Sequence, residues 1–270
     1  MTPYVPRLGG WLPDHTMPSA ASHADSSYAV ASGEIARLGS QVQDSVVEIN
    51  GVLDLRKWCS PIENQGHVGS CVGNAVVGSL EFLQIRSGRS LTDLSRLFVY
   101  YNSRLMCGDA DKDEGTYIRI AMGTLSSLGT CSEAKWSYDV NAVCVRPSWG
   151  SYREAYPNKI GSFYKIAAKG IDLIDNVKHA LLCQHPVVFG MVVDQDYMMY
   201  KGGVIATPSS TRVSAGQHAQ MIVGYDDMQR VFIVRNSWGE WWGESGYAFV
   251  PYNYLLMSEA NDFWVPTALT

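Results

Sequence analysis

A cysteine at the start of an apolar helical pattern, with a histidine and an asparagine far downstream, provides the residue types of a thiol catalyst. Cys71 ends the Gly-rich stretch Gln65-Gly66-His67-Val68-Gly69-Ser70-Cys71, and His218 and Asn236 follow in the second half of the chain. Cysteine attacks a carbonyl as the thiolate, and a helix N-terminus and a neighbouring imidazolium both lower the pKa of a thiol. The pattern therefore predicts that Cys71 is a nucleophile activated in both ways.

The accompanying residues fit the remaining tasks of amide hydrolysis. His218 precedes a strand-like run, which would hold it rigidly as the general acid and base. Asn236 can accept a hydrogen bond from one imidazole nitrogen, while Gln65 and the backbone N–H of Cys71 can donate to an oxyanion. His67 is a nearer candidate base, but a turn residue just before the helix is poorly placed beside the sulfur. We therefore expect His218 to be the base.

Composition narrows the function classes. The chain has 270 residues, a hydrophobic fraction of 46% and a formal net charge of −5. We therefore expect one large domain or two lobes, and no nucleic-acid footprint, since Lys and Arg form no basic run. No apolar run reaches the length of a transmembrane helix, and the N-terminal sequence lacks a signal-peptide pattern, so we expect a cytoplasmic protein. No metal or cofactor is expected.

The six cysteines show no dense framework. If Cys71 is a free nucleophile, an odd number remains, so they cannot all pair with one another. We interpret most of them as buried thiols in a reducing compartment, with one bridge possible.

Apolar spacing predicts helices in the first half of the chain and strands in the second. A period near 3.6 predicts helices over 70–86, 94–105, 118–128 and 171–182, the second capped by Thr92 or Ser90. A period near two predicts strands over 187–193, 203–206, 219–225, 231–236 and 246–252. This segregation predicts an α+β fold, with a helical lobe over about 65–170 and a sheet lobe over about 186–260.

Residues 1–48 differ from the rest, because they are rich in Pro, Gly, Ser and Ala. Such a composition is not expected to form long regular elements. One interpretation is a disordered tail. The other is a pro-like inhibitory extension that lies across the cleft of a 49–270 domain, with Trp11 and Leu12 as its apolar anchors.

From about residue 50 to its end, the chain resembles the papain-like cysteine peptidases. The resemblance rests on the Gln65–Cys71 stretch, on His218-Ala219, on Tyr200-Lys201-Gly202-Gly203-Val204 and on Asn236-Ser237-Trp238-Gly239. It implies a two-lobed fold with the nucleophile on the central helix of an N-terminal helical lobe. A cleft would separate that lobe from a C-terminal antiparallel β-barrel-like lobe. A prokaryotic-type member with a short N-terminal extension fits best.

The resemblance also implies roles for individual residues. Cys71 and His218 would form the thiolate–imidazolium pair, Asn236 would orient the ring, and Gln65 would complete the oxyanion hole. The residues implied in substrate binding are Gly69, Gly115, Gly190, Gln217, Ala219 and Trp238. The backbone of Gly115 would pair with an extended peptide, and Trp238 would line the leaving-group side. Gly190, Gln217 and Ala219 would border a roomy, apolar pocket for the second residue before the cleaved bond.

Two departures from the family pattern concern the catalytic turn. Val68 stands where the family commonly has a cysteine, and Val72 replaces an aromatic residue. The first departure removes a familiar disulfide and fits an intracellular or prokaryotic-type member.

The function expected from these residues is that of a cysteine endopeptidase. It would hydrolyse peptides or proteins through an acyl-enzyme on Cys71, with its own N-terminal segment as a further partner of the cleft. Two alternatives remain open at this stage. One is a catalytically silent peptide-binding protein on the same fold, and the other is a related thiol acyltransferase or isopeptidase.

Overall fold

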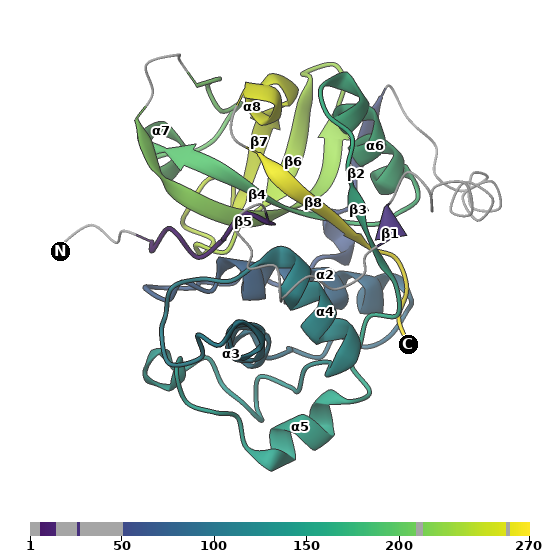
Figure 1. Ribbon diagram of the computed structural model, residues 1–270. Coiled ribbons are helices and arrows are strands. Elements are labelled where there is room, and N and C mark those ends of the chain that lie inside the picture. Colours follow the sequence, from purple (N-terminus) through teal and green to yellow (C-terminus); the bar gives the residue numbers. More distant parts are fainter. Residues whose placement is uncertain (1–5, 15–25, 28–50, 209–212, 258–259) are drawn as a thin grey trace.

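The computed structural model describes residues 6–14, 26–27, 51–208, 213–257 and 260–270. Helices gather on one side of the molecule and a twisted sheet on the other (Figure 1). The helical side contains α2 (Cys71–Arg86), α3 (Arg96–Cys107), α4 (Ile118–Ser127) and α5 (Trp149–Ala155), with the 3-10 turns η3 (Arg56–Trp58) and η4 (Val140–Ala142). This separation confirms the predicted α+β class.

The sheet collects strands from both ends of the chain. Its strands are β1 (Ser26–Ser27), β2 (Val52–Asp54), β3 (Phe163–Ile166), β4 (Val187–Asp194), β5 (Ser214–Asp226), β6 (Val231–Arg235), β7 (Tyr247–Pro251) and β8 (Asn261–Pro266). Their order is β1-β3-β8-β4-β5-β6-β7, with β2 paired to β5, and only the β1–β3 pair is parallel. Three helices accompany it, namely α6 (Ile171–Leu182), α7 (Gln195–Met198) and α8 (Tyr252–Met257).

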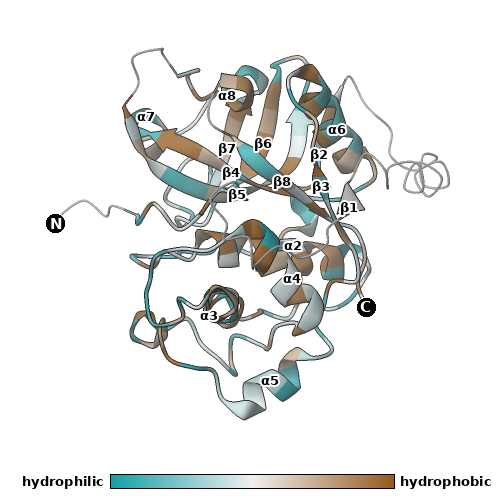
Figure 2. Cartoon of the chain, viewed as in Figure 1, coloured by the Kyte–Doolittle hydropathy of each residue, from teal (hydrophilic) through white to brown (hydrophobic). Residues whose placement is uncertain are grey.

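Helix α2 lies between the other helices and the sheet. Brown apolar stretches alternate with paler and teal ones along it in Figure 2, and every residue from Cys71 to Gln84 is buried. Glycines allow its neighbours to approach closely. A Cβ on Gly73 would lie 2.9 Å from the carbonyl oxygen of Arg96, and one on Gly78 would lie 3.0 Å from the Arg235 guanidinium. Close packing at these two glycines thus fixes the position of the central helix from both sides.

The local structure differs from the sequence expectations at a few points. The N-cap of α3 is Ser95, whose hydroxyl accepts from the Phe98 N–H at 3.2 Å, so Thr92 and Ser90 are not the cap. The expected strand over 203–206 is reduced to an isolated bridge between Val204 and Phe249. Strands β3 and β8 and the short helices α5 and α8 were not predicted.

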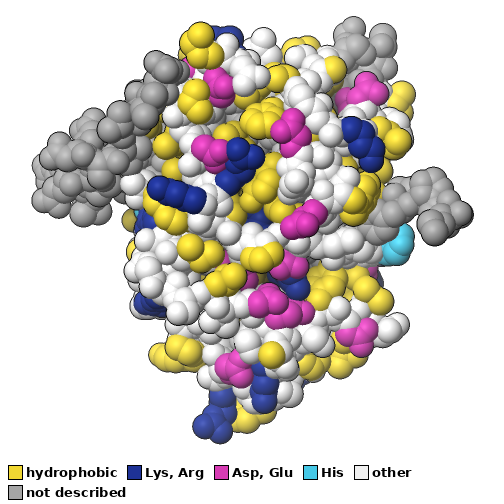
Figure 3. Space-filling model, turned by 180° about the vertical axis from the view of Figure 1, so that it is seen from behind, with side chains coloured by type: hydrophobic (Ala, Val, Ile, Leu, Met, Phe, Trp, Pro, Cys, Tyr) yellow, Lys and Arg dark blue, Asp and Glu magenta, His cyan; other side chains and the backbone are white. Residues whose placement is uncertain are grey.

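The cysteine side chains are free thiols, and most of them lie near the surface. All six cysteines lie in the described ranges as free thiols, but only Cys71 and Cys131 are buried, so the expectation of mostly buried thiols was wrong. On the face shown in Figure 3, basic and acidic side chains are interspersed among apolar ones. No described helix is both long and apolar enough to span a membrane.

A buried carboxyl connects α2 to the sheet lobe. Glu81 accepts from the Ser60 hydroxyl at 2.6 Å and from the Leu94 N–H at 2.9 Å. The same Ser60 hydroxyl accepts from Arg235, the last residue of β6, at 3.0 Å. Burial raises the pKa of Glu81 to about 7 from its ordinary value of 4.5, although the donors oppose this shift.

We expect Glu81→Gln to remove a pH dependence of stability. Since the pKa of Glu81 is higher in the folded than in the unfolded chain, the folded protein binds more protons between pH 4.5 and about 7. The contribution of Glu81 to the unfolding free energy therefore falls as pH rises through that window, by about 3 kcal/mol at most. In denaturant melts from pH 5 to 8, the stability of the parent should fall relative to that of the variant, because buried His185 and His218, whose pKa values burial lowers to about 3 and about 4, affect both chains equally.

The matched control is Glu154→Gln, because Glu154 is an exposed carboxyl whose pKa is lowered by hydrogen bonds from Ser132. This variant should keep the parent's dependence of stability on pH from pH 5 to 8. Equal slopes for the parent and Glu81→Gln would contradict the assignment.

Candidate active site

A turn fixed by hydrogen bonds leads into α2 at Cys71. The Asp113 carboxylate accepts from the Gly69 N–H at 3.0 Å and from the Tyr100 hydroxyl at 2.7 Å. The Tyr138 hydroxyl donates to the carbonyl of Gln65 at 2.9 Å, and it also contacts the Ser70 hydroxyl. These contacts hold the turn in place where a disulfide is missing.

His218 and Asn236 are joined by a buried hydrogen bond. His218 Nε2 lies 2.7 Å from Asn236 Oδ1, and the Ser237 N–H donates to the same oxygen at 2.7 Å. Antiparallel pairing of β5 with β6, with Met221 opposite Arg235, brings the two residues together. The Trp238 ring stacks on the imidazole with centroids 4.4 Å apart and is fully buried.

This arrangement sets the tautomer of the histidine. An amide oxygen that accepts from a backbone N–H presents only lone pairs, so His218 Nε2 carries the proton. The Nδ1 atom is then an acceptor, and it is buried with no hydrogen-bond partner among the described residues. A buried acceptor in this position is suited to take a proton from a nearby thiol.

The sulfur of Cys71 lies beside the histidine strand at the start of α2. The backbone amides of Ala219, Val72 and Cys71 itself favour its ionised form, and Ala219 directly follows His218. Burial outweighs them and raises the pKa of the Cys71 thiol to about 12. Burial also lowers the pKa of His218 to about 4, against the hydrogen bond from Asn236. Both groups are therefore neutral at pH 7 in this covered arrangement.

Gln65 is held next to the turn by both ends of its amide. Its Oε1 accepts from the Ser237 hydroxyl at 2.8 Å, and its Nε2 donates to the carbonyl of Val68 at 3.1 Å. The same nitrogen donates to the carbonyl of Arg7 at 3.2 Å. The predicted oxyanion donor is thus aimed at a backbone carbonyl from the N-terminal segment.

Residues 6–14 run between the helices and the sheet, as the narrow purple coil near the N-terminal label of Figure 1 shows. The Gly9 N–H donates to the Gln217 carbonyl at 2.8 Å. Thr116 pairs with the segment on the opposite side: its N–H donates to Gly10 at 3.0 Å, and its carbonyl accepts from Leu12 at 2.9 Å. The segment therefore bridges the two lobes directly above the thiol.

Two glycines permit this close passage. A Cβ on Gly10 would lie 2.8 Å from the Cys71 sulfur and would overlap the backbone of Gly69. Gly115 has a φ of +87°, and a Cβ there would lie 2.7 Å from the carbonyl oxygen of Gly9. Both positions require that no side chain be present.

Trp11 fills the pocket beside Gly190 and is fully buried. A Cβ on Gly190 would overlap the indole ring, so the small residue creates the room. The indole N–H donates to Asp262 Oδ2 at 3.2 Å. Lys165 Nζ lies 2.6 Å from Asp14 and 3.1 Å from Asp262, which ties the end of the segment to β3 and β8.

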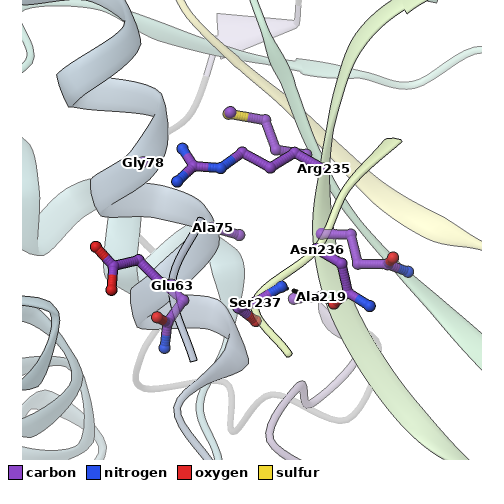
Figure 4. Close-up of a pocket in the computed structure, with 10 residues that line it drawn as sticks. Glu63, Ala75, Gly78, Ala219, Arg235, Asn236 and Ser237 are labelled. Atoms are coloured by element: carbon purple, nitrogen blue, oxygen red, sulfur yellow. Dashed lines mark hydrogen bonds between the residues drawn. The ribbon is translucent and has the colours of Figure 1, made fainter. Parts of the chain in front are cut away.

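A small internal cavity lies behind the candidate dyad, between α2 and the β5–β6 pair (Figure 4). Glu63, Ala75, Gly78, Ala219, Arg235, Asn236 and Ser237 are among the residues that line it. Its volume of about 10 Å³ is room for no more than one water molecule. The cavity is thus too small for a substrate side chain. In the described ranges, no group of His, Cys, Asp and Glu side chains is arranged to hold a metal ion.

The structure brings most of the expected residues to one place. Cys71, His218, Asn236 and Gln65 meet where the two lobes join, with Trp238 packed on the imidazole. Around residues 6–14 lie Gly69, Gly115, Gly190 and Gln217, while Ala219 directs its amide at the sulfur.

Two expectations differ in detail from the structure, and part of a third lies outside the described residues. The amide of Gly115 donates to the Tyr100 hydroxyl at 3.0 Å, so Thr116 makes the strand-like pairing instead. Leu12 is only half-buried, whereas Leu8 packs against Gly216. The other parts of the predicted extension, residues 1–5, 15–25 and 28–48, lie outside the described residues.

Several contact residues escaped the sequence analysis. Thr116 adjoins a glycine that was singled out, and this adjacency is the one signal that could have found it. Asp113 and Asp262 carry no local pattern, because each acts on residues far away in sequence. Arg7, whose guanidinium contacts Asp113 at 2.8 Å, lies in a segment with no periodicity.

Comparison with known proteins gives consistent matches. Residues 50–260 match the family described as papain family cysteine protease. A peptidase C1-like protein of Acanthamoeba polyphaga mimivirus is 34% identical over 87% of this chain and 78% of its own length. Pro-cathepsin H of Mus musculus is 30% identical over 71% of the chain, which spans only 56% of that relative. The crystal structure of xylellain, a cysteine protease from Xylella fastidiosa, superposes with a TM-score of 0.76 at 30% identity and 97% coverage of both chains.

Gly10→Ala should uncover the thiol. The new methyl would meet the Cys71 sulfur and rigid backbone atoms of Gly69, so the segment must move away. We expect alkylation of Cys71 by iodoacetamide at pH 8 to become at least about tenfold faster, because exposure lowers the pKa of the thiol. Peptide mapping by mass spectrometry would follow the rate at each cysteine.

Gly123→Ala serves as the control, since a Cβ at that helical position meets nothing within 4 Å. It should leave the alkylation rate of Cys71 unchanged. Unchanged alkylation in Gly10→Ala would show that the segment does not cover the sulfur in solution.

Proposed function

The chain belongs to the papain family of cysteine proteases, and from this premise we propose that it is a cysteine endopeptidase with Cys71 as its nucleophile. The observation that carries the proposal is the His218–Asn236 hydrogen bond of 2.7 Å beside the sulfur. It leaves the acceptor nitrogen of the ring for the thiol proton. Peptides or proteins are the substrates, and we propose residues 49–270 as the peptidase domain.

The reaction uses the groups in sequence. The Cys71 thiol passes its proton to His218 Nδ1, and the sulfur attacks the carbonyl carbon of the substrate. The oxyanion is stabilised by the N–H of Cys71 and by Gln65 Nε2. The imidazolium then protonates the leaving amine, and a thioester remains on the sulfur. Water, deprotonated by His218, hydrolyses this acyl-enzyme and restores the thiol.

Asn236 acts on this cycle through the ring. Its oxygen accepts from Nε2 in both the neutral and the cationic form of His218, so the imidazole keeps its orientation while it gains and loses a proton. Trp238, stacked on the imidazole, keeps water from this hydrogen bond.

The N-terminal segment is proposed to hold the enzyme inactive. In a substrate, the residue that fills the Gly190 pocket precedes the residue over the sulfur, whereas here Trp11 follows Gly10. The segment thus runs opposite to a substrate, and the Gly10 carbonyl is directed at the Thr116 N–H, 3.0 Å away. Supporting contacts come from Arg7, whose carbonyl engages Gln65. Bound in this way, the segment presents no cleavable bond and excludes water from the thiol.

Loss of the segment's anchors should activate the chain. In a full-length variant with Arg7, Leu8 and Trp11 all replaced by Ser, hereafter the opened chain, the buried indole no longer stabilises the covered state. Burial of a large apolar side chain contributes about 2 to 3 kcal/mol, so hydrolysis of a fluorogenic peptide library should accelerate by about thirtyfold or more. The pH at which Cys71 alkylation is half-maximal should fall as well. Equal rates for parent and opened chain, with equal melting temperatures, would contradict autoinhibition but not the peptidase assignment.

The base is tested by two histidine variants of the opened chain. His218→Ala should lower kcat/KM by at least about a thousandfold, because nothing else can accept the thiol proton. His67→Ala should keep most of the activity, since His67 is exposed on the turn. The reverse result would overturn the assignment. Mass spectrometry of the products should show hydrolysed peptides as the main products, with acyl transfer to added amines as the minor route.

A further inference from the structure

The floor of the Trp11 pocket is a buried carboxylate. Asp262 is 4% exposed and is the second residue of β8, after Asn261, which pairs with Gly190 of β4. Its Oδ2 accepts from the Trp11 indole N–H at 3.2 Å and from the Asp14 N–H at 2.8 Å. Both donors belong to the N-terminal segment, so Oδ2 loses them when the segment leaves.

The backbone directs this carboxylate into the pocket. Asp262 has a φ of +55°, in the left-handed region that side chains other than glycine rarely adopt. Its other oxygen, Oδ1, pairs with Lys165 of β3 at 3.1 Å, a contact that involves no atom of the segment. Oδ2 is therefore held toward the pocket as an acceptor that needs a new donor.

Two positively charged side chains near Asp262 favour a neutral hydrogen-bond donor over a charged one. Lys165 and Arg119 contact the Asp14 carboxylate at 2.6 and 3.1 Å in the covered state. When Asp14 leaves, Lys165 stays beside Asp262, and both positive groups lose their contact with the Asp14 carboxylate. A substrate side chain carrying a positive charge would be repelled by them, whereas a neutral N–H donor would not.

We propose that Asp262 selects substrates with tryptophan, a large neutral side chain with an N–H donor, at the second residue before the cleaved bond. The glycine at position 190 provides room for the indole, and Oδ2 accepts from its N–H. This inference rests on the proposed peptidase function and replaces the simple expectation of an apolar pocket. Phenylalanine and leucine fit the same volume but leave the buried oxygen without a donor, which is costly.

The test compares three fluorogenic peptides that differ only at this position. They carry tryptophan, β-(3-benzothienyl)alanine or arginine, where the second has the shape of tryptophan with sulfur in place of N–H. With the opened chain, we expect kcat/KM for the tryptophan peptide to exceed that for the benzothienyl peptide about tenfold or more, since the acceptor is charged. The arginine peptide should also be cleaved more slowly than the tryptophan peptide.

Variants of the opened chain assign this preference to one residue. Asp262→Gly removes the carboxylate and suits the positive φ, so the tryptophan to benzothienyl ratio should fall to about one. Ser245→Gly is the matched control, because Ser245 is exposed and has a φ of +53°. It should leave the ratio unchanged. If Asp262→Gly does not fold, Asp262→Asn, which tolerates the same backbone, should lower the ratio to a few-fold.

The outcomes separate this inference from the proposed function. Cleavage of the tryptophan and benzothienyl peptides at equal rates, or a ratio that Asp262→Gly leaves intact, would overturn the role of Asp262. Faster cleavage of the arginine peptide would overturn selection for a neutral donor. If no peptide is cleaved although faster Cys71 alkylation shows that the thiol is uncovered, the peptidase proposal fails. In that case, the Kd values of the tryptophan and benzothienyl peptides, measured by calorimetry on the opened chain carrying Cys71→Ser, still test the pocket through their ratio.

Discussion

The hydrogen bond between His218 and Asn236 determines which nitrogen of the imidazole is available to the sulfur. Because the amide oxygen also accepts from the Ser237 N–H, a flipped amide would set two N–H groups against each other. The orientation of Asn236 is thus fixed by the backbone of its own strand end, and the tautomer of the ring follows from it. The pairing of β5 with β6 brings His218 and Asn236 together, and Trp238 packs on the imidazole ring. Everything assigned to Cys71 depends on this geometry.

The same burial has opposite effects on two interactions. A dry environment strengthens the neutral hydrogen bond of the dyad, but it disfavours the separation of charge between sulfur and ring. In the proposed latent state, the catalytic residues therefore already have the arrangement needed for the reaction. The segment excludes only water and substrate from them. Gly10 brings this about with backbone atoms alone, which is why the contact can be so close. Activation then requires removal of a segment rather than rearrangement of the site.

The sequence predicted the elements whose signals are local. The apolar spacing along 70–86 predicted α2, and the change of period after Pro186 predicted β4 to β7. Both patterns arise because these elements bury one or all of their faces. The cap of α3 was placed a few residues too early, since Ser90, Thr92 and Ser95 all have capping side chains. Strand β8 was missed, and Asp262 with it, because its partners lie at positions that no window of sequence connects. Trp11 was found as an anchor, but the residue that receives its N–H was not.

The hydrogen bonds of Asp113 have a consequence for the conditions in which this protein can work. Reductants preserve a nucleophilic thiol, whereas they weaken a scaffold that is held together by disulfides. Here all six thiols are free, and a carboxylate with its donors, Gly69 and Tyr100, restrains the catalytic turn. A reductant that keeps the Cys71 thiol reduced therefore leaves the folded structure intact, because no disulfide stabilises the catalytic turn.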